Sequence, residues 1–283
     1  MRPYLFGETS PALGVAYSRY VPQFLAHHPG AIDYIEVPYE MLRHDPSILA
    51  DAAAPLVLHC ATLSIGGTVP CAEESIAEIR QFVERTQTPW IGEHLAYITA
   101  TRPTGGDTPY NVGYTVSPPM NRQVLERVVA RLREYQLRFP VPLLIENSPL
   151  YFALPTSTMS QAEFLTEVCA RSSAGLLLDL THFYITSQTM KFDPLAALQS
   201  LPLQAAVEIH ISGVESSSEA LWDDHSSVAP QIIYEMLHCV LERAMPRAVT
   251  LEYNWPRRFP EALLRSQIER TRAALGRAVQ CPS

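Results

Sequence analysis

The chain has 283 residues, of which 18% are charged and 47% belong to the hydrophobic class, and this balance excludes an intrinsically disordered protein. Its formal net charge is −8 and no run of Lys or Arg stands out, so we expect no nucleic-acid partner. The amino terminus lacks a basic stretch followed by a long apolar one, and no apolar run approaches the roughly 18 residues that span a bilayer. We therefore expect a cytoplasmic protein with no membrane partner.

Short apolar runs recur along the chain, and helix-like stretches separate many of them. Eight such runs are predicted strands, at residues 13–18, 33–38, 55–60, 90–96, 141–147, 175–180, 205–213 and 248–255. Apolar residues at helical spacing predict helices at 72–88, 119–139, 160–171, 228–245 and 260–275. Several strand runs, such as PLVLH and GLLLD, have the continuous hydrophobicity of strands that are covered on both faces.

Eight strands alternating with helices predict an α/β fold, a single closed (β/α)₈ TIM-like barrel that spans residues 1–283. We expect a tail from about residue 277 to be disordered. An open doubly wound sheet is the alternative, but no Gly-x-Gly-x-x-Gly follows the first strand. Two long loops, at 101–119 and 212–227, follow the fourth and seventh strands, where barrel enzymes build their active sites.

Polar side chains that bind metals stand at the end of one predicted strand after another. Because a parallel barrel brings the carboxyl ends of its strands to one face, residues far apart in the sequence are expected to share one pocket. The candidate metal ligands are His59, His94, Glu146, Asp179, His182, His210, Asp223, His225 and Glu252. Nine ligands exceed what one metal ion takes, so the sequence predicts two or three ions.

The charge balance of this pocket also indicates metals. Carboxylates that are buried side by side repel one another and stay protonated unless cations compensate them. The strand ends offer almost no Lys or Arg to do so. Imidazoles together with carboxylates suit zinc, iron or manganese, and ligand type alone leaves the choice among these metals open.

The five cysteines are odd in number, scattered and without a Cys-x-x-Cys pair, which disfavours disulfides and a structural zinc site. Cys60 neighbours His59 on the third strand, so strand alternation is expected to point it away from the pocket. Glu36 and Glu40 stand at the end of the second strand, either as hydrogen-bond partners of ligands or as ordinary loop residues. For Asn111 and Asn147 both a place in the pocket and a structural role stay open, with a turn as the alternative for Asn111.

At these residues the sequence resembles the multinuclear non-haem iron-dependent oxidative enzymes, a family long catalogued as a domain of unknown function. The matching segments extend from about residue 31 to 256 and are LHCATLSIGG, IGEHLAYI, LLIENSPLYF, GLLLDLTHFYITS, EIHISGVE, WDDHS and TLEYNWP. The resemblance implies a TIM-barrel-like fold that binds two or three iron ions. It also implies oxygen-dependent modification of cysteines in a ribosomally made precursor peptide, often with a small leader-binding partner protein.

By the same resemblance, the nine candidate residues match the family's metal ligands. Glu146 is expected to bridge two irons. One iron is assigned to Asp179, His210 and Glu252, the other to His182, Asp223 and His225, and a third site to His59 and His94. Glu146, Asp179 and His210 are the residues expected to act most directly in catalysis.

Two other classes of protein remain as alternatives. A divalent-metal barrel of the xylose-isomerase or endonuclease IV type also gathers His, Glu and Asp at strand ends. Sugar isomerases usually place a lysine near the metals and nucleases need a basic surface, and neither feature is apparent in the sequence. The third reading is a metal-binding scaffold without catalysis, which predicts no open coordination position.

Overall fold

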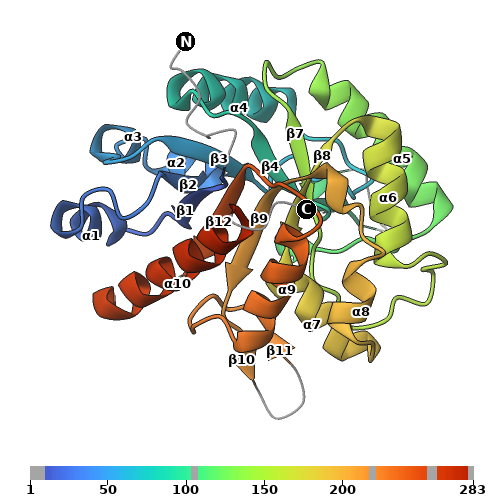
Figure 1. Ribbon diagram of the computed structural model, residues 1–283. Helices are drawn as coiled ribbons and strands as arrows, with labels where there is room; N and C mark the ends of the chain where they lie inside the picture. The colour runs from blue at the N-terminus through green and yellow to red at the C-terminus, as the bar shows by residue number, and fades with distance from the viewer. Residues whose placement is uncertain (1–9, 103–107, 217–220, 254–259, 280–283) are drawn as a thin grey trace.

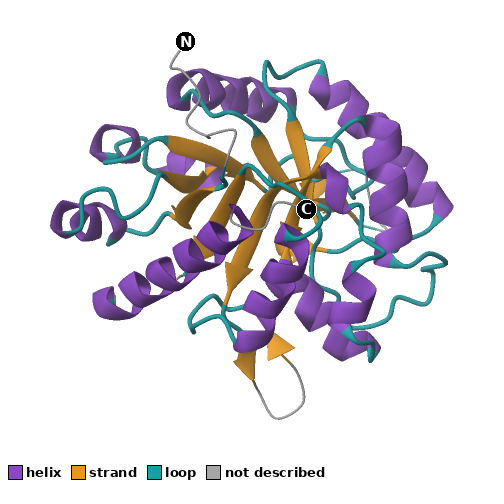
Figure 2. Cartoon of the chain, viewed as in Figure 1, coloured by secondary structure: helices purple, strands orange, loops and turns teal. Residues whose placement is uncertain are grey.

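The computed structural model describes residues 10–102, 108–216, 221–253 and 260–279, with side chains up to residue 276. Eight parallel strands close into a barrel in the order β1-β12-β9-β8-β7-β4-β3-β2 (Figures 1 and 2). They are β1 (Ala12–Ala16), β2 (Tyr34–Pro38), β3 (Leu56–Cys60), β4 (Ile91–His94), β7 (Leu143–Glu146), β8 (Gly175–Asp179), β9 (Ala206–Ser212) and β12 (Ala248–Glu252). The predicted α/β barrel is confirmed, and each predicted strand contains one of these eight apart from a residue or two at its ends.

Helices lie around the outside of the barrel (Figure 2). The five predicted helices are α4 (Glu73–Thr86), α5 (Arg122–Gln136), α6 (Gln161–Ser172), α9 (Gln231–Leu241) and α10 (Glu261–Val279). Shorter ones not specified from the sequence are α1 (Val21–His27), α2 (Tyr39–His44), α3 (Ile48–Asp51), α7 (Leu180–Met190), α8 (Pro194–Leu198) and the 3₁₀ turn η1 (Leu203–Ala205). Most of these have seven residues or fewer, too few for a repeating apolar period.

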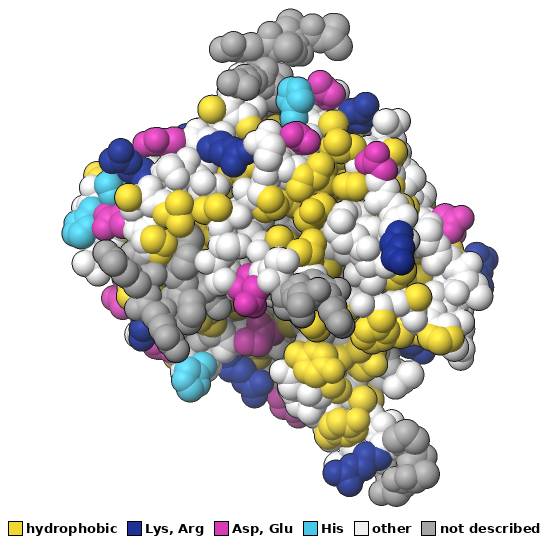
Figure 3. All heavy atoms as spheres, turned by 90° about the horizontal axis from the view of Figure 1, so that it is seen from below, with side chains coloured by type: hydrophobic (Ala, Val, Ile, Leu, Met, Phe, Trp, Pro, Cys, Tyr) yellow, Lys and Arg dark blue, Asp and Glu magenta, His cyan; other side chains and the backbone are white. Residues whose placement is uncertain are grey.

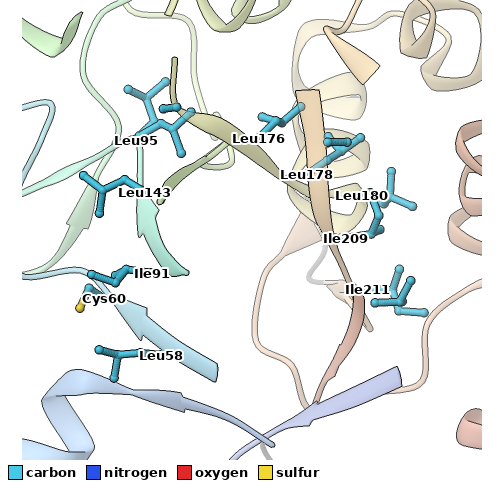
Figure 4. Close-up of a cluster of buried hydrophobic side chains, with 14 of the residues drawn as sticks. Leu58, Cys60, Ile91, Leu95, Leu143, Leu176, Leu178, Leu180, Ile209 and Ile211 are labelled. Atoms are coloured by element: carbon cyan, nitrogen blue, oxygen red, sulfur yellow. The ribbon is translucent and has the colours of Figure 1, made fainter. Parts of the chain in front are cut away.

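Alternation along the strands separates two apolar layers. Tyr34, Val57, Trp90, Leu144 and Leu177 pack together inside the barrel. Their neighbours along the strands point outwards and pack under the helices in a second, larger cluster. Figure 4 shows part of this outer layer, which includes Leu58, Cys60, Ile91, Leu143, Leu176, Leu178, Ile209 and Ile211. The interior layer fills the barrel toward the amino ends of the strands, and polar side chains occupy the carboxyl ends.

The two predicted long loops contain hairpins, which the sequence analysis did not foresee. The first loop holds most of the antiparallel ribbon of β5 (Tyr97–Thr101) and β6 (Pro109–Val116). The second holds the short pair β10 (Glu215–Ser216) and β11 (Leu221–Trp222), which projects from the barrel in Figure 1. Both hairpins lie on the side of the carboxyl ends of the barrel strands, because they follow β4 and β9 directly.

Helix α10 is described to Val279, and residues 280–283 of the expected disordered tail lie outside the described residues. The assignment of all 283 residues to one domain stays a prediction. In the described part of the chain, no helix has both the length and the apolar character needed to cross a bilayer.

Candidate metal centre

The nine candidate side chains come from six barrel strands and the segments that follow them. His59 is the second-last residue of β3, His94 ends β4, Glu146 ends β7 and Glu252 ends β12, while His210 lies in β9. Asp179 ends β8 and is also the N-cap of α7, where its Oδ1 accepts a hydrogen bond of 2.6 Å from the backbone N–H of His182. Asp223 and His225 follow β11. The closed barrel brings all nine to one face, as the sequence predicted.

Glu146 lies at the centre of this set. Its Oε2 is 2.9 Å from His59 Nε2 and 3.3 Å from His94 Nε2. Its Oε1 is 3.3 Å from His182 Nδ1 and 3.8 Å from His210 Nδ1. The two oxygens therefore face different groups of imidazoles.

A second group surrounds Asp223. The two oxygens of Asp223 lie 2.8 Å from His182 Nε2 and 2.8 Å from His225 Nε2. Asp179 Oδ2 lies 3.7 Å from His182 Nε2. His225 has a positive φ of 57°, an uncommon value for a residue with a side chain, and it still directs Nε2 at Asp223. The ligand atoms of His182, Asp223 and His225 lie within 4.8 Å of one another.

A third group surrounds His210. Its Nδ1 lies 3.2 Å from Glu252 Oε2, and its Nε2 lies 2.9 Å from Glu36 Oε2. The candidate ligands thus form four sets, and within each set the ligand atoms lie within 4.8 Å of one another. The sets are His59–His94–Glu146, His182–Asp223–His225, Glu36–His210–Glu252 and Glu146–Asp179–His182. This grouping places Asp179 with Glu146 and His182, whereas the resemblance pairs it with His210 and Glu252. The division of ligands among individual ions remains a proposal.

Unpartnered atoms within the site test whether the residues fit metal ions. Asp179 Oδ2, His210 Nδ1, His225 Nε2 and Glu252 Oε2 are buried and make no hydrogen bond of good geometry, although His210 Nδ1 lies 3.2 Å from Glu252 Oε2 and His225 Nε2 lies 2.8 Å from Asp223. A buried polar atom without a partner costs about 1–3 kcal/mol, so four in one pocket form an expensive arrangement for a site without a cation. Each of the four is a lone-pair donor of the type that zinc, iron and manganese accept. The residues therefore fit metal ions.

The far nitrogens of three histidines are held by other groups. His94 Nδ1 lies 3.3 Å from the carbonyl oxygen of Cys60, and His182 Nδ1 lies 2.9 Å from that of Asn147. His210 Nε2 faces Glu36 at 2.9 Å. If each of these nitrogens carries the proton, the opposite nitrogen presents its lone pair to the pocket. Metal-binding histidines are held in the same way by a carbonyl or carboxylate behind them.

The electrostatics show how the acids behave without cations. Burial and the neighbouring carboxylates raise the pKa of Asp179 to about 8. Burial acts in the same direction on Glu146, but His94, His59 and His182 around it hold its pKa at about 2. Burial also raises the pKa of Glu36, to about 7. Among the described residues, no Lys or Arg pairs with any acid of the site, so only imidazoles, protons or metal ions can balance these charges.

The site has a buried floor and a more open rim. His59, Glu146, Asp179, His182 and His210 are buried, whereas His94, Asp223, His225 and Glu252 are partly exposed. A substrate approaching from solvent would therefore meet the ligands on β4, β12 and the segment after β11 first.

Figure 3 shows the distribution of surface charge: on the face it presents, basic side chains of the described chain lie singly among acidic and hydrophobic ones.

The other residues considered from the sequence have structural roles. Cys60 packs in the outer layer, as expected. Glu36 is a buried partner of His210, which resolves the two alternatives in favour of hydrogen bonding to a candidate ligand. Glu40 accepts from the Ala61 N–H and the Thr62 hydroxyl in the loop after β3. Asn111 lies in the exposed strand β6, where its Oδ1 accepts from the Gly113 N–H.

Asn147 holds the end of the neighbouring strand in place. Its side-chain amide donates to the carbonyl oxygen of Asp179 at 2.8 Å and accepts from the Asp179 N–H at 2.9 Å. Its own carbonyl faces His182. Asn147 therefore acts on the site through the backbone of β8 rather than by lining a cavity.

Another buried acid, Glu208, was not singled out from the sequence. Its carboxylate accepts hydrogen bonds from Tyr34, Thr250 and Trp90 at 3.1, 2.7 and 2.6 Å. Glu208 precedes His210 by two residues on β9, so this network lies deeper in the barrel than His210. The spacing of Glu208 and His210 was the available signal, because residues i and i+2 of a strand share one face.

Comparison with known proteins identifies the family. Residues 12–275 match the family described as RiPP precursor modification enzyme MbnB/TglH/ChrH. The chain belongs to this family. Because the match covers nearly the whole chain, the family predicted from the resemblance is confirmed, and it is a family of enzymes that act on precursors of ribosomally synthesised, post-translationally modified peptides (RiPPs).

Several curated relatives carry the name UPF0276 protein. One from Bordetella bronchiseptica is 31% identical over 229 residues, which cover 78% of this chain and 76% of the relative. One from Anaeromyxobacter sp. is 33% identical over 183 residues, or 64% of this chain and 62% of the relative. One from Streptomyces avermitilis is 25% identical over 94% of this chain and 55% of the relative. The chain thus spans less than two thirds of the length of the last two.

Solved structures with low sequence identity support the fold. A xylose isomerase-like TIM barrel protein from Mycobacterium smegmatis in complex with magnesium aligns with a TM-score of 0.60 at 11% identity, covering 96% of this chain and 98% of that one. A Thermus thermophilus protein soaked with ZnCl₂ aligns with a TM-score of 0.53 at 19% identity, covering 94% and 98%. At these identities the likeness concerns the fold alone.

Proposed function

We propose that this enzyme binds two or three iron ions at the candidate metal centre and uses dioxygen to oxidise a cysteine of a ribosomally made precursor peptide. The observation that carries the proposal is the convergence of nine imidazole and carboxylate side chains, four of them with an unpartnered buried atom, in a member of a peptide-modifying family. Neutral imidazoles with carboxylates are the ligand set of non-haem iron centres that leave positions open.

Three sets of residues would each hold one metal ion. His59, His94 and Glu146 would hold one ion, His182, Asp223 and His225 a second, and His210 with Glu252 a third, with Glu146 and Asp179 joining neighbouring groups. Bound iron would bind the substrate thiolate and would supply electrons for the reduction of dioxygen. The protein contributes a preorganised arrangement of ligands, since it holds His94, His182 and His210 from behind.

The partly exposed ligands define where the peptide approaches. Because His94, Asp223, His225 and Glu252 border the solvent-facing side, a cysteine thiol entering there meets this rim before it reaches the buried Glu146. Glu146, Asp179 and His210 are buried at the floor of the site, and we assign them to catalysis. A small partner protein that holds the leader of the precursor, and the cytoplasm as the place of action, belong to the same proposal.

A direct test uses protein reconstituted with Fe²⁺ under nitrogen and a cysteine-containing precursor peptide, supplied with a leader-binding partner from the same gene neighbourhood. On admission of oxygen with a reductant, mass spectrometry should show a change in peptide mass that maps to the cysteine. The peptide with Ser in place of Cys should stay unchanged, as should the reaction with Glu146→Gln. Chemistry that proceeds equally without oxygen on Mn²⁺, Mg²⁺ or Zn²⁺ would instead favour an isomerase-like or nuclease-like divalent-metal enzyme.

A further inference from the structure

An apolar pocket of about 400 Å³ lies beside the metal centre, between the segment after β7 and the helices α7 and α8. It is lined mainly by apolar side chains, among them Leu150, Phe152, Met159, Phe183 and Phe192, and none of the described residues that line it is charged. The pocket takes no part in the site described above. Its volume falls in the range of ligand-binding cavities.

Two segments connect the pocket directly to the metal centre. Phe183 lines the pocket, and the preceding residue of α7 is His182. Phe152 lines it as well, and the preceding Tyr151 accepts a hydrogen bond from the Asp223 N–H at 3.3 Å and stacks on Trp222 with ring centroids 4.8 Å apart. Each segment therefore places one residue at the metal centre and the next one in the pocket.

Consecutive Cα atoms are about 3.8 Å apart, so the pocket and the metal centre are separated by little more than the lengths of two side chains, roughly 10–15 Å. An extended peptide covers that distance in about three to five residues. A substrate cysteine at the centre thus brings a nearby side chain of the same peptide to the pocket. Phe152 is 65% exposed at this position, which leaves an apolar surface in contact with solvent.

One polar group in the lining lacks a partner. Gln161 is 6% exposed, and its Nε2 donates to the carbonyl oxygen of Ser148 at 2.8 Å. That bond fixes which end of the amide is oxygen, and Gln161 Oε1 is buried without a hydrogen-bond donor. Because this oxygen is buried, it does not face the open volume of the pocket, so the occupant is selected by its apolar surface, of which a large aromatic side chain offers the most.

We propose that this pocket is a specificity subsite that receives a large aromatic side chain located three to five residues from the cysteine of the precursor peptide. The inference rests on the proposed function, because it requires a cysteine peptide at the metal centre. It adds a recognition element that reads the sequence around the cysteine. The chemistry at the metals then proceeds on peptides that the subsite has placed.

Binding of synthetic peptides under nitrogen tests the subsite without turnover. The probes are fluorescein-labelled peptides of Gly and Ser with one Cys and one Trp four positions away, on either side. Their counterparts carry Ala for Trp or Ser for Cys. With the iron-loaded protein, fluorescence anisotropy should show that Trp tightens binding at least about tenfold over Ala in one of the two directions.

Ser200 lies in the turn after α8, is exposed and lines the pocket, so Ser200→Trp fills the pocket from there and should reduce the Trp-over-Ala ratio to less than about twofold. Gln199→Trp at the neighbouring position is the matched control, because Gln199 is exposed and does not line the pocket, and it should keep the full ratio. Cysteine-dependent binding with equal affinity for Trp and Ala peptides would overturn the subsite and leave the proposed function standing. A Trp effect that Ser200→Trp leaves intact would likewise overturn it. Absence of any cysteine-dependent binding would overturn both.

Discussion

Glu146 is the residue whose loss should damage the metal centre most, because its two carboxylate oxygens face separate groups of ligands. Oε2 approaches His59 and His94, and Oε1 approaches His182 and His210. Glu146→Gln keeps the shape of the side chain and removes its charge. We expect the variant to fold and to bind metal weakly at two groups at once.

The magnitude follows from the free energy that each ligand contributes. Tetrahedral structural zinc sites bind with about 10–16 kcal/mol, which is roughly 3–4 kcal/mol for each of four ligands. A loss of that size weakens binding by roughly 100–1,000-fold, since each 1.4 kcal/mol is about a factor of ten. For Glu146→Gln the weakening should appear in at least two binding events. His225→Gln is the matched comparison, because His225 belongs to one group only and should affect one event.

The assay is an anaerobic titration with Fe²⁺ against a chromophoric chelator, with circular dichroism to verify the fold of each variant. Glu146→Gln should lose tight binding of more than one ion per chain, whereas His225→Gln should lose tight binding of one ion per chain. The bridging interpretation would be refuted by a folded Glu146→Gln protein that binds as many ions as the wild type with affinities within about tenfold of it.

Three further predictions concern the surroundings of the centre. Glu36→Gln should weaken metal binding about 10–100-fold in the same titration, because Glu36 orients His210; unchanged affinity would assign Glu36 to stability alone. Leu177→Ala should lower the free energy of unfolding by roughly 2–5 kcal/mol in urea denaturation with the metal stoichiometry kept, and a loss below about 1 kcal/mol would contradict the packed barrel interior. Burial raises the pKa of the Cys60 thiol well above its usual value and that of Cys169 to about 12, so native protein at pH 8 should leave both unlabelled by iodoacetamide, and labelling of Cys60 would show that it is accessible.

The barrel could be predicted because its strands are covered on both faces and read as continuous apolar runs, such as GLLLD before Asp179. The outward position of Cys60 followed from strand alternation alone. The hairpins β5–β6 and β10–β11 could not be predicted in the same way. Their strands are exposed or short and depend on contacts outside the local sequence, so the segments read as loops.

The candidate site shows the same division. The convergence of strand-end residues follows from the topology of a parallel barrel and was available from sequence. The grouping of Asp179 with Glu146 and His182 was not, because it depends on how far each side chain reaches across the barrel. The hydrogen bonds of Glu208 required knowing that Tyr34 on β2, Thr250 on β12 and Trp90 just before β4 face it. Sequence spacing within one strand holds no information about these partners.

The central claim is that these imidazoles and acids gather around iron. Crystals grown under nitrogen with Fe²⁺ allow the most direct measurement, an anomalous difference map recorded above and below the iron absorption edge. We predict two or three peaks that disappear below the edge, each at bonding distance from at least one of the groups around Glu146, Asp223 and His210. A map without iron peaks there, with the acids hydrogen-bonded to one another or to protonated histidines, would contradict the account.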